Sequence, residues 1–313
     1  MSEDDEPVDT CCASCGIAEI DDMKLKECDG CDLVKYCSDE CRENHKSEHE
    51  EYCKKRAAEL RDELLFKQPE STHLGDCPIC CLPMPLDNTK FVVYACCGKR
   101  ICRGCWHANN TRGITPNHIV PFLPEMMACP FCRTATKSTK QTDKQLMKRA
   151  KANDPAALCL LGGKYNDKGY YSRAFECFTK AAELGEMPAH YELSSLYHFG
   201  QFVEKDEVKS VHHREEAAIG GHPGARYSLG AYESSNENFE RAVKHWIIAA
   251  TQGFDDSMEM VMVAFRRGLI SKEDLASVLR AHKAAVDATR SPQRQAADDY
   301  FRNNELLHGS KKY

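Results

Sequence analysis

Cysteine pairs fill the first part of this 313-residue chain, and a helical repeat fills most of the rest. The sequence therefore predicts small zinc-stabilised α+β modules at the N-terminus and an all-α helical-repeat solenoid at the C-terminus. Of the 19 cysteines, all except Cys159 and Cys177 lie before residue 133. Most stand in C-x2-C pairs, a spacing typical of metal ligands and not of disulfides.

The first group of cysteines follows an acidic leader at 1–10, which we expect to be disordered. Its spacing is C-x2-C, C-x2-C, C-x3-C and then H-x3-C, and eight soft ligands of this kind suit two tetrahedral zinc ions. In so short a segment, metal binding would supply most of the folding free energy. The candidate ligands are Cys12, Cys15, Cys28, Cys31, Cys37, Cys41, His49 and Cys53.

This group resembles the MYND zinc finger, including its Tyr36-Cys37-Ser38 run and the basic residues after the last cysteine. The resemblance implies a cross-braced finger over 11–53. One ion would take Cys12, Cys15, Cys37 and Cys41, and the other Cys28, Cys31, His49 and Cys53.

Two residues compete with this assignment. Cys11 is a spare thiol that could replace Cys12, and His45 is a rival to His49. His45 lies eight residues before Cys53 instead of four, so a helical turn would not bring it to the same ion.

The composition of residues 54–70 predicts a helical connector. Leu60, Leu64 and Lys67 recur at the spacing of one helix face, and Pro69 then ends the helix. A connector that packs on a neighbour is favoured over a helix that binds a partner.

A second cysteine-rich segment spans 74–134. It contains three more C-x2-C pairs and one adjacent pair, and the run at 90–95 predicts a strand. We expect a short helix to begin at 106–110 and a long loop to follow over 111–128. The candidate ligands are Cys77, Cys80, Cys96, Cys97, Cys102, Cys105, Cys129 and Cys132.

This segment resembles a RING finger, most of all the all-cysteine variety in the ligase subunit of the cytoplasmic deadenylase complex. The run at 101–107 carries the resemblance. In that family the first and third pairs share one ion, here Cys77, Cys80, Cys102 and Cys105. The second ion would take the middle pair with Cys129 and Cys132.

The middle pair departs from the family pattern. The usual histidine position holds Lys99, whose ammonium has no lone pair for zinc. Two alternatives stay open: Cys96 and Cys97 both bind, or one of them binds together with His107 or His118. Cys81 is a further spare thiol.

The RING resemblance also implies a surface for a ubiquitin-conjugating enzyme. The family's contact positions hold Ile79, Trp106, Pro130 and Arg133. Each could instead have no role in docking. Ile79 could cover the zinc and Trp106 could lie in the core. Pro130 could stiffen its turn and Arg133 could be an exposed charge. RING modules position the thioester of the conjugating enzyme, so we predict no catalytic residue in this chain.

After a polar linker at 135–150, a repeat with a period of about 32 to 36 residues spans 151–290. Its copies carry an Ala, Leu, small, Tyr pattern followed by Ala-Ala-x-x-Gly, and the fourth copy is degraded. The pattern resembles Sel-one-like repeats, relatives of the TPR repeat, which implies stacked helix pairs. Tyr165 and Tyr197 fit core positions better than a ligand site. Residues 291–313 predict a final helix and a tail.

Composition limits the function. No run of 18 apolar residues exists and the leader is acidic, so we expect no membrane span and no signal peptide, and a cytoplasmic or nuclear location. The net charge of −6 disfavours nucleic acid as a partner, despite a local basic group. That group comprises Lys99, Arg100, Arg103, Lys137 and Lys140.

No catalytic triad, phosphate loop or paired-carboxylate site is visible in the sequence. The favoured hypothesis is a ubiquitin ligase or ligase subunit that binds about four zinc ions, recruits a conjugating enzyme and presents a client. The client proteins or Pro-containing peptides would bind the MYND-like module or the repeats. The alternative is a non-enzymatic adaptor whose zinc modules are purely structural.

Overall fold

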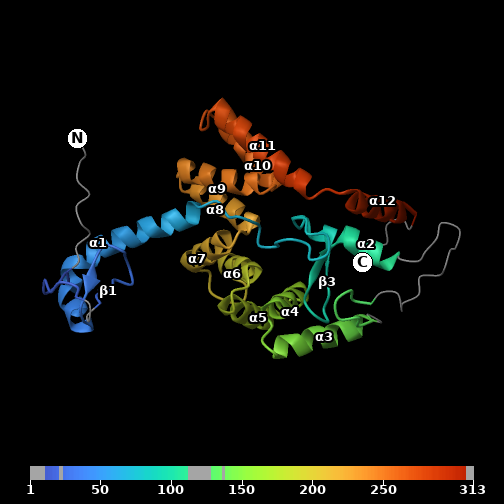
Figure 1. Cartoon of the computed structure of the whole chain (residues 1–313). Helices are drawn as coiled ribbons and strands as arrows, with labels where there is room; N and C mark the ends of the chain where they lie inside the picture. Colours follow the sequence, from blue (N-terminus) through green and yellow to red (C-terminus); the bar gives the residue numbers. More distant parts are fainter. Residues whose placement is uncertain (1–10, 21–23, 112–127, 136–137, 308–313) are drawn as a thin grey trace. The chain divides into compact units, whose positions relative to one another are not determined.

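The computed structural model describes residues 11–20, 24–111, 128–135 and 138–307 (Figure 1). The chain divides into two compact units, 1–67 and 68–313, which we describe separately. The expected acidic leader, most of the expected loop at 111–128 and the last residues of the tail lie outside the described residues.

The first unit combines a small hairpin with one long helix. Strands β1 (Lys26–Glu27) and β2 (Lys35–Tyr36) pair antiparallel, and helix α1 runs over Asp39–Phe66. Ser38 caps α1, because its hydroxyl accepts a hydrogen bond from the backbone N–H of Cys41 at 3.2 Å. The predicted connector is therefore not a separate element. The finger and the connector share α1, since its sequence contains no proline or glycine to interrupt it.

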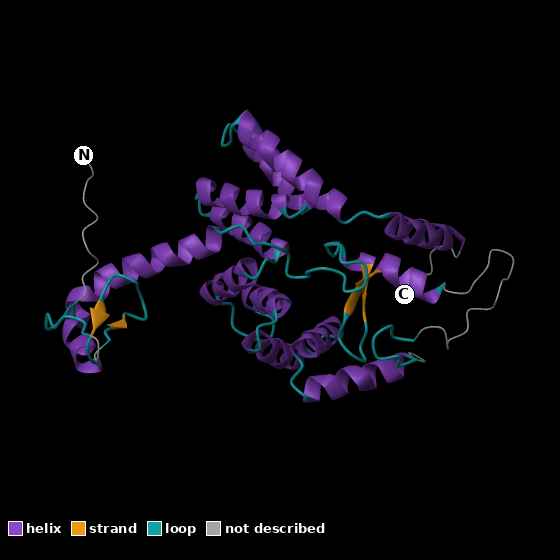
Figure 2. Cartoon of the chain, in the orientation of Figure 1, coloured by secondary structure: helices purple, strands orange, loops and turns teal. Residues whose placement is uncertain are grey.

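The second unit begins with the other cysteine-rich segment. A short turn of 3-10 helix, η1 (Asn88–Lys90), leads into the antiparallel pair β3 (Phe91–Val93) and β4 (Arg100–Cys102), followed by helix α2 (Arg103–Asn110). Figure 2 shows this hairpin and the one in the first unit as the only strands among the described residues. The predicted strand and short helix are thus present. Apart from Met84, Tyr94 and Ile101, the buried core here consists of cysteines.

Most of the segment that was expected to be a polar linker forms a helix. Helix α3 spans Thr139–Lys151 and begins at Ser138, whose hydroxyl caps the backbone N–H of Gln141. Leu146 and Ala150 are buried on this helix in the same core as the first repeats. Burial of this apolar face stabilises a segment whose polar composition alone suggested a loop.

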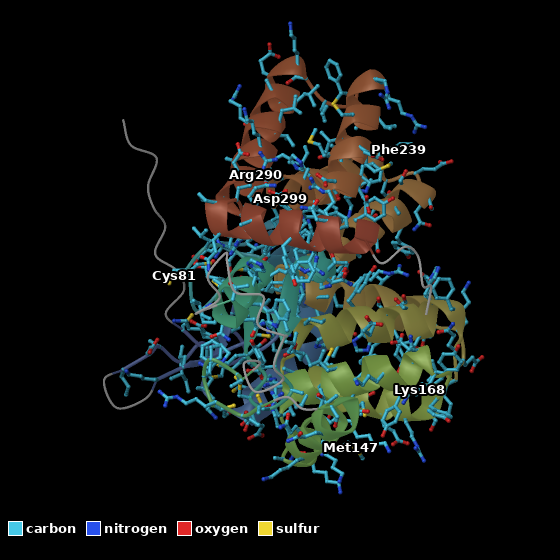
Figure 3. The ribbon with its side chains drawn as sticks, turned by 90° about the vertical axis from the view of Figure 1, so that its right-hand side faces the viewer. Cys81, Met147, Lys168, Phe239, Arg290 and Asp299 are labelled. Atoms are coloured by element: carbon cyan, nitrogen blue, oxygen red, sulfur yellow. The ribbon has the colours of Figure 1, made fainter. Side chains whose placement is uncertain are left out.

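The rest of the unit consists of helix pairs that stack into a solenoid, as predicted. In Figure 3, Lys168 and Phe239 mark turns between the two helices of a pair. Gly185, Gly221 and Gly253 follow the second helices with φ between 82° and 88°, the left-handed conformation that ends a helix. The pairs are α4 (Pro155–Asp167) with α5 (Tyr171–Glu183), α6 (Met187–Phe199) with α7 (Glu207–Ile219), α8 (Pro223–Ser235) with α9 (Phe239–Thr251), and α10 (Asp255–Arg266) with α11 (Lys272–Ala288).

The two helices of each repeat interlock through residues that are sixteen positions apart. A Cβ on Gly162 would lie 2.7 Å from the Phe178 ring, and one on Gly230 would lie 2.4 Å from the ring of Trp246. In the middle repeat the small residue is Ser194, whose carbonyl accepts a hydrogen bond of 2.7 Å from the hydroxyl of another small residue, Ser210. In the first and third repeats an aromatic ring on one helix therefore faces a glycine on the other, and in the middle repeat two serines meet.

Helix α12 (Pro292–Leu307) lies along α2 of the second cysteine-rich segment (Figure 1). The predicted final helix thus packs on residues about 190 positions earlier in the chain. Among the described residues, none of the helices combines the length and apolar character that a membrane crossing requires.

Candidate metal centres

Sixteen candidate ligands gather into four groups of four, and within each group the ligand atoms lie within 4.8 Å of one another. All 19 cysteines are described and all are free of disulfides. We number the groups in chain order. Cluster 1 is Cys12, Cys15, Cys37 and Cys41; cluster 2 is Cys28, Cys31, His49 and Cys53; cluster 3 is Cys77, Cys80, Cys102 and Cys105; cluster 4 is Cys96, Cys97, Cys129 and Cys132.

The spacing of these atoms fits a tetrahedral ion. Four sulfurs at the usual Zn–S distance of about 2.3 Å from zinc lie roughly 3.8 Å from one another. The sulfur–sulfur distances are 3.7 Å for Cys28 and Cys53 and 3.8 Å for Cys80 and Cys102. They are far longer than the S–S bond of about 2.05 Å in a disulfide. The donor set therefore fits structural zinc in each cluster.

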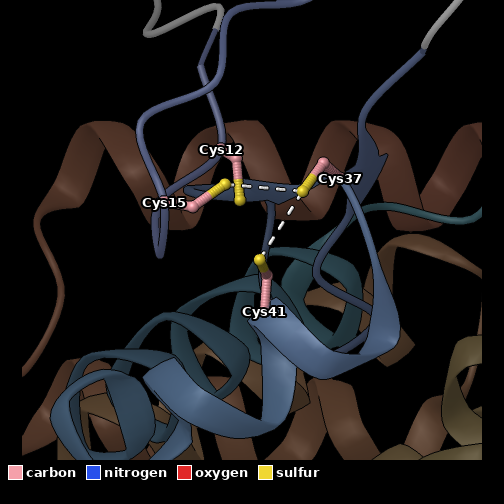
Figure 4. Close-up of side chains that lie close together, drawn as sticks. All are labelled: Cys12, Cys15, Cys37 and Cys41. Carbon is pink, nitrogen blue, oxygen red and sulfur yellow. Dashed lines mark hydrogen bonds between the residues drawn. The ribbon is translucent and has the colours of Figure 1, made fainter.

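Cluster 1 is built from three elements of the first unit (Figure 4). Cys12 and Cys15 stand on an N-terminal turn, Cys37 follows β2, and Cys41 lies in the first turn of α1. The Cys37 sulfur lies 3.5 Å from the sulfurs of both Cys15 and Cys41. The Ser38 cap thus fixes the helix turn that carries one of the ligands.

Cluster 2 contains His49 and not its rival His45. The Nε2 atom of His49 lies 3.2 Å from the Cys31 sulfur, and the ring is buried. The Nδ1 atom of His45 instead lies 3.1 Å from the Tyr36 hydroxyl. Burial, followed by the charge of His45, lowers the pKa of His49, which favours the neutral imidazole that binds metal. Cys11 lies outside the four clusters.

Three of the C-x2-C turns share one backbone shape. The residue after the second cysteine is left-handed: φ is 73° at Gly16, 54° at Cys81 and 57° at Arg133. In each turn this residue's N–H bonds the carbonyl of the first cysteine, at 2.8 to 2.9 Å. The turn aims both thiols to one side, and Cys81 itself stays exposed and outside the clusters.

Cluster 3 is the most deeply buried of the four. Cys77, Cys102 and Cys105 are at most 2% exposed. Backbone N–H groups donate to two of the sulfurs: Cys102 to Cys77, and Cys105 to Cys102, each at 3.4 Å. Cys102 is also the residue that caps α2. The thiols therefore receive hydrogen bonds that stabilise their charged form.

Cluster 4 brings the two adjacent cysteines together. Cys96 lies 3.3 Å from Cys132, and Cys97 lies 3.5 Å from Cys129. Both stand at the tip of the β3–β4 hairpin, in a tight turn whose N–H groups bond the Tyr94 carbonyl. Among the described residues, both adjacent cysteines thus lie within one cluster, which favours the first of the two alternatives for the middle pair.

The alternatives to that choice have other surroundings. His107 packs on Tyr300 with ring centroids 4.7 Å apart, and His118 lies outside the described residues. Lys99, in the usual histidine position, places its ammonium 4.8 Å from the centre of the Phe131 ring. The role of these sixteen residues as zinc ligands stays a prediction that metal analysis must test.

The thiols of the clusters differ in how readily they ionise. Burial raises the pKa of Cys12, but backbone N–H groups outweigh it and lower the pKa to about 6. The Thr134 hydroxyl leads the contacts that lower the pKa of Cys132 to about 6. Neighbouring thiols raise the pKa of Cys37 to about 12, and burial raises the pKa of Cys105. A doubly charged ion would stabilise all four thiolates at once.

The four residues predicted to contact a conjugating enzyme have different surroundings. Ile79 is 43% exposed, Arg133 is also exposed, and Pro130 is half-buried. Trp106 packs against Phe301 of α12, with ring centroids 5.6 Å apart. Ile79 and Arg133 are thus accessible, whereas a ring from the C-terminal helix packs on Trp106.

Sequence reasoning missed the contribution of α12 to this module. Arg294 donates a hydrogen bond of 3.4 Å to the Cys80 sulfur, and Phe301 covers Trp106. The amphipathic pattern of the segment signals a helix but does not identify its partner.

Family models match two regions of the chain, the first cysteine-rich segment and the helical repeats. Residues 12–53 match the MYND finger, and residues 155–186, 188–222 and 223–254 match the Sel1 repeat. The chain contains a MYND finger and three Sel1 repeats. Together with the four clusters, the MYND finger is consistent with about four zinc ions per chain.

Solved structures similar to this chain include other repeat proteins. A Sel1 repeat protein from Oxalobacter formigenes has a TM-score of 0.43 and 22% identity, over 55% of this chain and 82% of its own. A protective antigen of uropathogenic Escherichia coli with an SLR fold has a TM-score of 0.39 and 21% identity. The match covers 57% of this chain and 38% of the antigen. A Pseudomonas aeruginosa protein has a TM-score of 0.39 and 21% identity. The match covers 50% of this chain and 64% of that protein.

Proposed function

We propose that this protein-interaction chain is a ubiquitin ligase, or a subunit of one, which recruits a conjugating enzyme through residues 74–134. The observation that carries the proposal is the interleaving of clusters 3 and 4. Cysteine pairs one and three form one cluster and pairs two and four form the other, as in the RING fingers that the sequence resembles. Such a module transfers nothing itself but positions the thioester of its partner.

The exposed contact residues support the same proposal. Ile79 presents an apolar side chain beside cluster 3, and Arg133 presents a charge directly after the last cysteine of cluster 4. Arginine is enriched among the residues that contribute most binding free energy at protein interfaces, and an exposed apolar side chain gains from burial on docking. In this proposal Ile79 holds the conjugating enzyme and Arg133 contacts the ubiquitin that it carries.

We propose that the client binds the MYND finger, through a short Pro-containing peptide, or the repeats. A groove of about 530 Å³ between α6, α7 and α8 offers aromatic surface from Tyr191, Phe199 and Tyr227. Its charged wall is an ion pair of 3.1 Å between Arg214 and Glu207. Thiolate ligands need a reducing compartment, so the proposal places the chain in the cytosol or the nucleus.

A second candidate function is a non-enzymatic adaptor. Phe301 lies on Trp106, one of the four contact positions, and Lys99 stands where the family has a ligand. In an adaptor the second zinc module would only support the solenoid and the C-terminal helix. Fold alone does not decide between the two functions.

A self-ubiquitination assay with a panel of conjugating enzymes separates the candidates. We expect activity in the full chain, and a loss of about tenfold or more in Ile79→Ala and Arg133→Ala with zinc content unchanged. Val208→Ala serves as a matched control, because Val208 is 81% exposed on the repeats. Absence of activity with every conjugating enzyme would favour the adaptor.

A further inference from the structure

Arg294 is a buried cation that α12 delivers to cluster 3. Its side chain is 7% exposed. One terminal nitrogen donates to the carbonyls of Pro83 and Thr289, both at 2.7 Å. The other donates to the Cys80 sulfur at 3.4 Å and to the Leu82 carbonyl at 3.2 Å. The guanidinium therefore lies beside the first C-x2-C turn of the module.

The charge of this guanidinium has no carboxylate partner within the described part of the chain. A buried cation needs an anion, since neutral carbonyls satisfy its hydrogen bonds but not its charge. A zinc ion held by four thiolates carries a net charge of −2. Cluster 3 loaded with zinc would be that anion, and it touches Arg294 directly through Cys80.

Cluster 3 also needs such a cation more than the other all-cysteine clusters do. Cys15 in cluster 1 and Cys132 in cluster 4 are exposed, so water can solvate their negative charge. In cluster 3 three of the four thiols are buried, and the fourth, Cys80, is the one that Arg294 contacts. The cation thus meets the dianion that water solvates least.

Close contacts along α2 fix the position of α12. A Cβ on Gly104 would lie 2.9 Å from the Arg294 Cα, so glycine allows the two backbones to touch. The Gln293 amide donates to the Gly104 carbonyl at 3.3 Å. Farther along the helix, Phe301 packs on Trp106 and lies under the Arg103 guanidinium at 3.9 Å.

We propose that Arg294 is the counter-cation of cluster 3, and that zinc binding there and docking of α12 on α2 stabilise one another. Thermodynamic linkage makes the effect reciprocal. Docking of α12 raises the zinc affinity of cluster 3 by the same factor by which zinc raises the equilibrium constant for docking. Groups that bond to metal ligands change metal affinity by about 10-fold to 100-fold. The proposal concerns metal and helix only, and it holds for a ligase and for an adaptor alike.

Competition with a chromogenic chelator tests the metal side of the proposal in the full chain. In Arg294→Met we expect one of the zinc ions to leave at about 10-fold to 100-fold lower chelator concentration than in the wild type. Arg294→Lys keeps the charge but loses the fork of donors, so its effect should be smaller. Arg302→Met is the matched control, because Arg302 is an exposed arginine on the same helix that pairs with Asp299 at 3.6 Å.

Hydrogen exchange tests the helix side. During chelation of the wild type, the amides of α12 should lose protection at the same chelator concentration as those of the 77–105 segment. Unchanged zinc release in Arg294→Met, or α12 that stays protected after this ion has left, would overturn the proposal. So would an equal weakening of all four ions, which indicates a general loss of folding.

A second variant keeps the test decisive if Arg294→Met does not fold. Phe301→Ala leaves Arg294 in place and removes a distant part of the docking contact. We expect the same ion to leave more easily, by a smaller factor. Zinc release identical to the wild type in Phe301→Ala would contradict the coupling.

Discussion

Two neighbouring glycines on α4 offer a sharp test of how the repeats pack. A Cβ on Gly162 would lie 2.7 Å from a carbon of the Phe178 ring, whereas a Cβ on Gly163 would have no heavy atom within 4 Å. Both substitutions by alanine improve helix propensity by about 1 kcal/mol. Only Gly162→Ala also forces a carbon about 0.8 Å inside the roughly 3.5 Å at which carbon atoms make good contact.

The expected magnitudes follow from these distances. Overpacking of a tight site costs about 1–3 kcal/mol, so Gly162→Ala should be less stable than Gly163→Ala by that amount. Gly163→Ala should be more stable than the wild type by about 1 kcal/mol. Urea denaturation followed by circular dichroism at saturating zinc measures both.

A third variant identifies the cause. Phe178→Leu removes the ring that the new methyl group would meet. Gly162→Ala should therefore lower the free energy of unfolding less in that background than in the wild type. Equal stability of Gly162→Ala and Gly163→Ala would refute the reasoning that the interlocking of glycine and aromatic ring sets the helix spacing.

Three further predictions concern the metal clusters and pH. His49→Ala should remove one zinc ion and His45→Ala none, as counted by native mass spectrometry; the reverse result would exchange their roles. Cys96→Ser should lower the zinc content by one, and four ions in this variant would mean that the adjacent cysteine suffices. Burial, and then the charge of a neighbour, lowers the pKa of both His222 and His245 to about 3. Unfolding therefore takes up protons below about pH 6.5, and stability should fall with decreasing pH by about 1.4 kcal/mol per pH unit for each histidine. Urea midpoints at about pH 7.5 and 5.5 measure this loss, and a His245→Asn variant with the full wild-type slope would contradict it.

The parts of the fold that depend on local spacing could be predicted from the sequence. A C-x2-C turn brings its own two thiols together, and the Ala-Ala-x-x-Gly pattern places Gly221 where a helix must end. Those signals lie within a few residues, so the modules, the repeats and the zinc content followed from them. The adjacent Cys96 and Cys97 stayed ambiguous, since the backbone turn at the hairpin tip decides where both thiols point.

Features that depend on distant contacts could not be predicted. The linker composition suggested a loop, but burial of Leu146 against the repeats stabilises a helix there. Arg294 lies 214 positions from the cysteine that it contacts, and no local pattern in the sequence connects them. Likewise, the ring that lies on Trp106 comes from α12.

Native mass spectrometry of the intact 313-residue chain tests the central claim most directly, because it counts the metal ions bound to the folded protein. Four clusters of four ligands predict four zinc ions, with loss of folded structure around each cluster when its ion is removed by a chelator. A chain that binds fewer than four ions, or whose amides around the clusters keep their protection from hydrogen exchange after the metal is removed, would contradict the account.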